Sequence, residues 1–128
     1  MMVDRQPAAR ILIVEDEFLV RLTLVEALLD EGYQVVEAAN GDEALALLQA
    51  DPAISMLMTD VRLPGALDGL ALVRAARERR SDLPAVYMTG RPDALAGSLT
   101  PGRDALLAKP YLPSEATMTV RRLISGES

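Results

Sequence analysis

Short, continuously apolar stretches alternate along this chain with longer stretches in which apolar residues recur every three or four positions. The short stretches are Ile11 to Val14, Ile54 to Thr59, Leu83 to Met88 and Ala105 to Ala108, and the more polar stretch Tyr33 to Ala38 also reads as a strand. A strand without polar alternation is typical of a parallel sheet that helices cover on both faces. The alternation therefore predicts an α/β domain built from strand–helix units.

The length of the chain, 128 residues, suits one domain with a single core. Together with the alternation it predicts a doubly wound, flavodoxin-like fold, a five-stranded parallel sheet with strand order 2-1-3-4-5. We expect residues 10–125 to form this domain, residues 1–9 to be an N-terminal extension and residues 126–128 to be a C-terminal tail.

Helical spacing marks most of the segments between the strands. Phe18, Leu22, Val25 and Leu29 fall on one apolar helix face, and this helix is expected to end near Gly32. Other helix signals are Asn40 as the cap of a helix over 41–50, Ser114 as the cap of the last helix, and apolar faces at Leu70, Val73 and Ala76 and at Ala116, Val120 and Leu123.

The segment before the fifth strand is a poor helix former. It contains Pro92, Gly97, Pro101 and Gly102, which disfavour a regular helix. Any helix is confined to about residues 93–99, and we predict that this fourth helix is short, frayed or mobile.

Composition excludes several classes of chemistry. The chain has no cysteine and no histidine, so thiolate and imidazole metal sites, cysteine nucleophiles and an internal phosphohistidine are excluded. Its formal charge of −6 argues against a nucleic-acid or anionic-membrane surface. No stretch approaches the roughly 18 apolar residues of a membrane span, and the first ten residues lack the continuous apolar stretch that is typical of a signal peptide. We expect a cytoplasmic protein.

Polar residues stand where the predicted strands end. They are Glu15 and Asp16 after the first strand, Asp60 after the third, Thr89 after the fourth and Lys109 after the fifth. The functional crevice of such a sheet lies at this edge. Crowded carboxylates favour Mg²⁺, which prefers oxygen ligands, and a carboxylate can form an aspartyl-phosphate. A lysine and a hydroxyl can then contact the phosphoryl oxygens.

Each of these residues also has an ordinary structural interpretation. Acidic residues after a strand often solvate a loop, and Asp60 before a Pro-Gly pair is compatible with a simple turn. Their joint placement at successive strand ends favours the functional interpretation.

The segments ILIVEDE, MLMTDVRLPGALDG, PAVYMTG and LLAKPY resemble the receiver domains of two-component response regulators of the chemotaxis-regulator type, and the resemblance covers about residues 10–124. It implies that Asp60 is the phosphoacceptor and that Glu15 and Asp16 form the Mg²⁺ acidic pair. It also implies that the Arg62 carbonyl is a further metal ligand, Thr89 the switch hydroxyl and Lys109 the phosphoryl-binding lysine, with a cis peptide before Pro110.

The chain departs from the family pattern in two places. Leu106 stands where relatives often carry an aromatic switch residue, so output is expected instead from ordering of residues 91–104 around the phosphoryl group. The acidic pair is Glu15-Asp16 where many relatives have two aspartates. In addition, Arg91 could guide an anionic phosphodonor, obstruct the attacking water, or be a solvated surface charge.

By this resemblance the chain is a signalling switch, catalysing only its own phosphorylation and dephosphorylation. A sensor histidine kinase or histidine phosphotransfer protein would supply the phosphoryl group, docking on the helix that begins near Phe18 and Leu19. Output would pass to a downstream protein or drain phosphate from a shared pathway. The chain could equally be a receiver cut from a hybrid kinase or longer regulator.

Two alternatives belong to other classes. One is a phosphorylation-independent interaction module of the same fold. A test of Mg²⁺ binding would distinguish this module from a phosphoacceptor domain. The other is a small flavin-binding electron carrier, which would need a phosphate-binding loop after the first strand, whereas that loop is acidic here.

Overall fold

The predicted sheet is present in the computed structural model, which describes residues 8–126. Five parallel strands lie in the order β2-β1-β3-β4-β5, as expected. Their bounds are β1 Arg10–Val14, β2 Gln34–Ala38, β3 Met56–Asp60, β4 Ala85–Thr89 and β5 Asp104–Ala108. The proposed extension and tail fall largely on residues 1–7 and 127–128, which lie outside the described residues, so that division of the chain stays a prediction.

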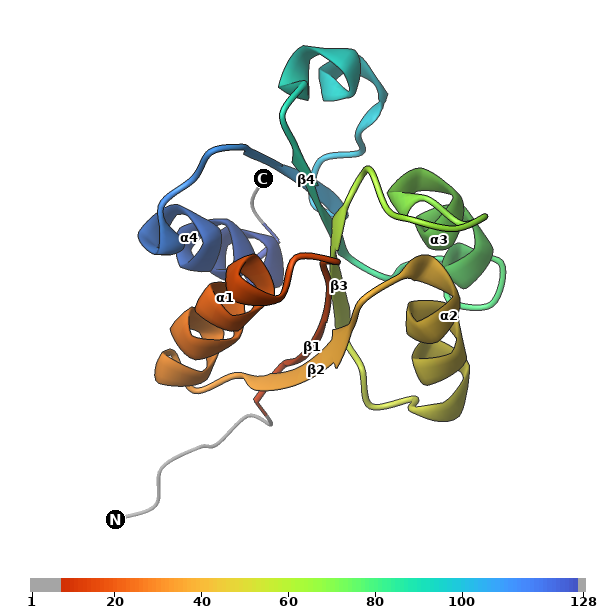
Figure 1. Cartoon of the computed structure of the whole chain (residues 1–128), viewed down its shortest axis with the longest axis horizontal. Coiled ribbons are helices and arrows are strands. Elements are labelled where there is room, and N and C mark those ends of the chain that lie inside the picture. Colours follow the sequence, from red (N-terminus) through yellow and green to blue (C-terminus); the bar gives the residue numbers. More distant parts are fainter. Residues whose placement is uncertain (1–7, 127–128) are drawn as a thin grey trace.

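Four α-helices cover the sheet, two on each face (Figure 1). They are α1 Phe18–Asp30, α2 Gly41–Ala50, α3 Gly69–Arg77 and α4 Pro113–Ile124. Helices α1 and α4 pack together on one face, and α2 and α3 on the other. None of these helices is both long and apolar enough to span a membrane.

The core consists of two apolar layers separated by the sheet. Successive strand residues point to opposite faces, so Ile11 and Ile13 of β1 pack under α1 and α4 while Leu12 and Val14 pack under α2 and α3. Both faces of the central strands are therefore buried, which explains why these strands show no polar alternation in the sequence.

The predicted apolar face of α1 is only partly correct. Leu24, Val25 and Leu28 are buried, whereas the side chains of Phe18 and Leu29 are 61% and 52% exposed. Nine of the thirteen residues of α1 are apolar, so apolar spacing does not single out one face of this helix. An apolar surface is left uncovered along the outer side of α1.

The predicted cap of the last helix is also wrong by position. The helix is capped at Leu112 and begins with Pro113, which suits a first helical position because it lacks an N–H. The Glu115 carboxylate accepts a hydrogen bond from the Leu112 N–H at 2.7 Å. The Asn40 cap is confirmed, since its side chain accepts from the Glu43 N–H at 2.8 Å.

The connection between β4 and β5 contains no α-helix. It holds two 3₁₀ turns, η1 Pro92–Ala94 and η2 Ala96–Ser98, and extends beyond the end of β4 (Figure 1). Leu95 is the only buried residue between positions 90 and 103. The prediction that this helix is short is thus confirmed, because two 3₁₀ turns of three residues each stand in place of an α-helix.

Candidate functional site

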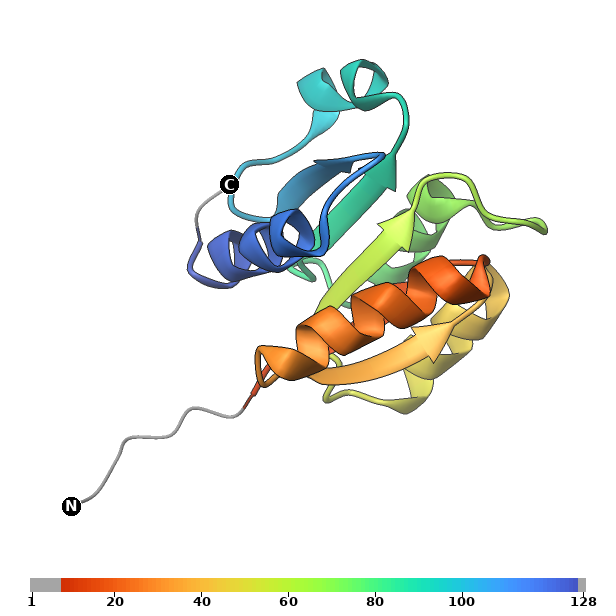
Figure 2. The same cartoon turned by 60° about the vertical axis from the view of Figure 1, so that its left-hand side comes forward.

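The carboxyl ends of the strands meet at one edge of the sheet, toward which the arrowheads point in Figure 2. Register places Val14 beside Thr59, Asp60 beside Met88, and Thr89 beside Ala108. The residues at or just after these ends are those singled out in the sequence: Glu15, Asp16, Asp60, Thr89 and Lys109. The parallel topology brings all five to the same edge.

Three carboxylates form a tight cluster at this edge. Ligand oxygens of Glu15, Asp16 and Asp60 lie within 4.8 Å of one another, with Glu15 and Asp60 buried and Asp16 exposed. The second oxygen of Glu15 accepts a hydrogen bond from the Glu17 N–H at 3.1 Å. Burial and the adjacent Asp60 raise the pKa of Glu15. The charged cluster is therefore unfavourable without a compensating cation.

The cluster fits a hard divalent cation. Oδ2 of Asp60 is buried and receives no hydrogen bond within residues 8–126, and Oε1 of Glu15 receives none either, although the Lys109 ammonium lies 3.5 Å from it. Unpaired buried carboxylate oxygens are costly unless a cation compensates them. An all-oxygen ligand set with one solvent-exposed side, at Asp16, suits Mg²⁺, which retains several waters.

Lys109 bridges two of these carboxylates. Its Nζ lies 2.6 Å from Oδ1 of Asp60 and 3.5 Å from Oε1 of Glu15. Burial alone would lower the pKa of Lys109, but its contacts with Asp60 and Glu15 outweigh burial and raise it. The Lys109–Pro110 peptide is cis, as the family resemblance implied. Lys109 is therefore a charged partner of Asp60 at neutral pH.

A cavity of about 550 Å³ opens beside Asp60 on the side of β4. Thr89, Lys109 and Arg62 line it together with Asp60. The Thr89 hydroxyl accepts a hydrogen bond from the Arg91 N–H at 2.9 Å. A Cβ placed on Gly90 would meet no atom within 4 Å, so this side is open. The metal role of the Arg62 carbonyl stays a prediction, as do the roles of the other site residues.

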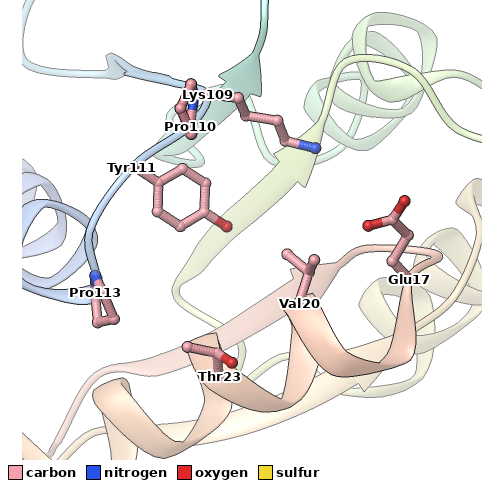
Figure 3. A pocket seen from close by; sticks show the side chains of 7 residues that line it. All are labelled: Glu17, Val20, Thr23, Lys109, Pro110, Tyr111 and Pro113. Atoms are coloured by element: carbon pink, nitrogen blue, oxygen red, sulfur yellow. The ribbon is translucent and has the colours of Figure 1, made fainter.

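A second hollow, of about 440 Å³, lies on the other side of Lys109 between α1 and the loop before α4. Figure 3 shows the Tyr111 ring facing Val20 and Thr23 of α1, while the Lys109 amine points to the end of β3. Burial and the nearby Glu15 and Asp60 raise the pKa of Tyr111, so its hydroxyl stays neutral. Tyr111 was not among the predicted site residues, although it directly follows the Lys109-Pro110 pair.

The first residue of α3, Gly69, packs directly against the backbone of Asp60. A Cβ on Gly69 would lie 2.0 Å from the carbonyl oxygen of Asp60, so only glycine fits. The Gly69 N–H donates to the Val61 carbonyl at 2.9 Å, and the Asp68 side chain caps the helix by accepting from the Ala71 N–H. This packing holds the Asp60 backbone against a regular helix.

Comparisons with known proteins identify the family. Residues 11–121 match the response regulator receiver domain. Aerobic respiration control protein ArcA of Escherichia coli (strain K12) is 39% identical over 118 residues, covering 90% of this chain and 48% of ArcA. Sensor kinase CckA of Brucella abortus is 33% identical over 127 residues, covering 97% of this chain and 13% of CckA.

Solved structures with a similar fold are also response regulators. A response regulator receiver protein from Sinorhizobium medicae superposes with a TM-score of 0.83 at 28% identity, covering 93% of this chain and 96% of that one. Chemotaxis response regulator CheY4 of Vibrio cholerae gives 0.79 at 29% identity, covering 91% and 98%. The chain spans about half, or less, of the length of the curated relatives named above. This chain belongs to the response regulator receiver domain family.

Proposed function

We propose that this chain accepts a phosphoryl group on Asp60 from a phosphohistidine of a partner protein and signals through protein contacts. Receiver domains are signalling switches, and the phosphoacceptor role fits this chain. The observation that carries the proposal is the Lys109 ammonium 2.6 Å from the buried Asp60 carboxylate, inside a cluster of three acidic residues.

The transfer needs little beyond positioning and charge neutralisation. An Asp60 carboxylate oxygen forms a bond to phosphorus, the P–N bond to the partner imidazole breaks, and its electron pair stays with the imidazole. Lys109 moves from Asp60 to a phosphoryl oxygen, and the Thr89 hydroxyl donates to another. Water later hydrolyses the acyl phosphate and restores the carboxylate.

Glu15, Asp16 and Asp60 would hold Mg²⁺, with the Arg62 carbonyl as a further ligand. The bound cation would offset the charge of the carboxylates and of the incoming phosphoryl oxygens. The buried oxygens Oε1 of Glu15 and Oδ2 of Asp60, which accept no hydrogen bond within residues 8–126, support this assignment.

The outer side of α1 is the proposed docking face for the phosphodonor. Phe18, Leu19 and Leu22 are exposed there, and the hollow of Figure 3 continues this apolar surface toward Lys109. A partner of the histidine kinase or phosphotransfer type, present with this chain in the cytoplasm, would bury these side chains while presenting its phosphohistidine.

The output face lies around β4 and β5. Leu106 is half-buried and cannot act as an aromatic switch, so the signal would pass through the segment of 3₁₀ turns that starts at Arg91. The downstream component would be a protein, since the acidic chain favours no nucleic acid or membrane surface.

The phosphorylation-independent module is not favoured, because a module of that kind has no need of the Glu15, Asp16, Asp60 and Lys109 cluster. The acidic loop after β1 likewise argues against a flavin carrier, whose cofactor phosphate it would repel.

Intact mass measured after incubation with acetyl phosphate tests the proposal. We expect the wild-type chain to gain one phosphoryl group in Mg²⁺ and none in EDTA, and Asp60→Asn to gain none. Asp82→Asn, which alters an exposed aspartate outside the site, should behave as wild type. Failure of the folded wild type to gain mass, both here and with a phosphorylated kinase, would overturn the proposal and favour the interaction module.

A further inference from the structure

The loop between β1 and α1 carries two of the three clustered carboxylates, those of Glu15 and Asp16. Helix α1 has no side-chain cap at its start, because the side chain of its N-cap residue, Glu17, accepts no hydrogen bond from the helix. Helices α2 and α3, by contrast, are capped by the side chains of Asn40 and Asp68. Some other group therefore has to hold the loop that presents Glu15 and Asp16.

The side chain of Arg21, one turn into α1, contacts this loop. Its Nη1 donates to the carbonyl oxygen of Glu15 at 2.6 Å, and its Nε donates to Oε1 of Glu37 at 3.0 Å. Its guanidinium carbon also lies 5.7 Å from the centroid of the Phe18 ring. Only 15% of the Arg21 side chain is exposed. A planar, permanently charged donor with three partners has little freedom to move, so it fixes the position of the Glu15 carbonyl.

Glu15 is thereby held at its backbone and at its side chain. Its N–H donates to the Ala38 carbonyl at 3.1 Å, its own carbonyl accepts from Arg21, and its Oε2 accepts from the Glu17 N–H at 3.1 Å. The carboxylate oxygen that accepts no hydrogen bond within residues 8–126 is Oε1. Because the side chain is buried and held in this way, a shift of the Glu15 backbone would displace Oε1.

Two hard cations would respond differently to a displaced ligand. Mg²⁺ demands a near-ideal octahedron at short distances, whereas Ca²⁺ accepts six to eight oxygens in a flexible arrangement. The charge of Arg21 acts in the opposite direction from its contact with Glu15, because a positive charge near carboxylates disfavours any cation. By charge alone, loss of Arg21 would therefore strengthen the binding of both cations.

We propose that Arg21 is a positioning residue that sets the preference of the carboxylate cluster for Mg²⁺ over Ca²⁺ by holding the Glu15 backbone. The inference rests on the proposed function, which assigns Mg²⁺ to Glu15, Asp16 and Asp60. Arg21 supplies no ligand itself, because a guanidinium group has donors and no acceptor. It acts through the carbonyl of Glu15.

Calorimetric titration with magnesium chloride and with calcium chloride tests the proposal. We expect Arg21→Ala to raise the Kd for Mg²⁺ about tenfold, at the lower end of what loss of an outer-shell partner costs. The Kd for Ca²⁺ should change less than about twofold, because its coordination is flexible. Arg21→Lys should recover part of the Mg²⁺ affinity, because an ammonium can donate to the Glu15 carbonyl but lacks the planar fork that also reaches Glu37.

Arg10→Ala is the matched control, because it removes an arginine at the opposite end of β1 that pairs with Asp51 at 2.8 Å. It should leave both Kd values as in wild type. Urea denaturation in EDTA measures how much stability each variant loses and so separates a structural loss from a change in cation binding.

Equal shifts of the two Kd values in Arg21→Ala, or a loss of stability with neither Kd changed, would overturn the proposal. Arg21→Lys keeps the test decisive should Arg21→Ala not fold, since a ratio of the two Kd values equal to that of wild type would also overturn it. If folded wild type bound neither cation, the metal site of the proposed function would fail, and the role of Arg21 with it.

Discussion

Two connections leave the sheet beside Asp60, and they are built very differently. The connection after β3 leads into α3, which Asp68 caps and which buries Leu72, Val73 and Ala76. The connection after β4 holds only the two 3₁₀ turns and buries Leu95 alone. The hydrogen bonds at its ends include those from the Arg91 N–H to the Thr89 hydroxyl and from the Thr100 N–H to the Asp104 carboxylate.

The two connections therefore contribute differently to the stability of the domain. Burial of apolar area is the main source of stability, so α3 contributes to the fold and fixes the Asp60 backbone. The β4–β5 connection contributes little burial and can change conformation at small cost. We therefore expect the connection that carries Arg91, rather than α3, to respond to the proposed phosphorylation.

The largest expected difference between the two connections is in the rate of amide hydrogen exchange. Amides of residues 73–77 should exchange about a thousandfold more slowly than those of residues 93–99, because local opening of a poorly buried segment costs far less than global unfolding. A phosphoryl analogue bound with Mg²⁺ should slow exchange in residues 91–104 and leave α3 unaffected. Unchanged exchange in that segment would refute ordering as the output.

Matched truncations should show the same contrast in stability. Leu72 is fully buried and Leu95 is 8% exposed. Leu72→Ala should lower the free energy of unfolding by about 4 kcal/mol and Leu95→Ala by about 1 kcal/mol, because the second site can relax around the lost atoms. Urea denaturation measures both, and equal losses would mean that the β4–β5 connection is as well packed as α3.

Replacing one glycine in each connection by alanine tests how tightly the backbone is packed there. A Cβ on Gly69 would collide with the Asp60 carbonyl, whereas a Cβ on Gly97 would meet nothing within 4 Å. Gly69→Ala should therefore cost about 3 kcal/mol through overpacking. Gly97→Ala should stabilise by about 0.5 kcal/mol, because it restricts the unfolded chain. A tolerated Gly69→Ala would show that α3 does not hold the Asp60 backbone rigidly.

The smallest expected effect comes from the charge of Glu15, which directly follows β1 and belongs to neither of the two connections. The pKa of Glu15 is raised above its ordinary value of 4.5, so the folded chain binds this proton more tightly than the unfolded chain. Stability is therefore lost as pH rises above that value and through the raised pKa. In EDTA, Glu15→Gln should raise the free energy of unfolding at pH 7 and leave it nearly unchanged at pH 4.

Glu26→Gln, at an exposed position of α1, is the control and should shift stability at neither pH. Thermal unfolding at the two pH values measures the difference between the variants. A stabilisation of Glu15→Gln that persisted at pH 4 would point to packing rather than to charge.

The strands and the site were predictable because both follow from short-range signals. Continuously apolar runs identify buried parallel strands, and the residue at each strand end is placed by the topology, so Asp60 and Lys109 had to approach one another. The weak helix before β5 was equally visible, because Pro92 and Pro101 remove backbone donors.

Other features depend on contacts that no local pattern encodes. The buried face of α1 was not predictable, since only packing against β1 and α4 selects Leu24 and Leu28 over Phe18 and Leu29. The helix start at Pro113 depends on the Glu115 side chain reaching back to Leu112. The cavity beside Asp60 is lined by residues from two separate connections, among them Arg62 after β3 and Arg91 after β4.

The salt bridge of Lys109 has a consequence for which ions the domain can use. The three carboxylates and one ammonium leave two formal negative charges at the edge of the sheet. One divalent ion cancels these two charges. A monovalent ion leaves one net negative charge, which would repel an incoming phosphoryl group. Under the proposed function, the charge count of four side chains predicts a coincidence detector, a domain that answers to a phosphodonor only while a divalent cation is present.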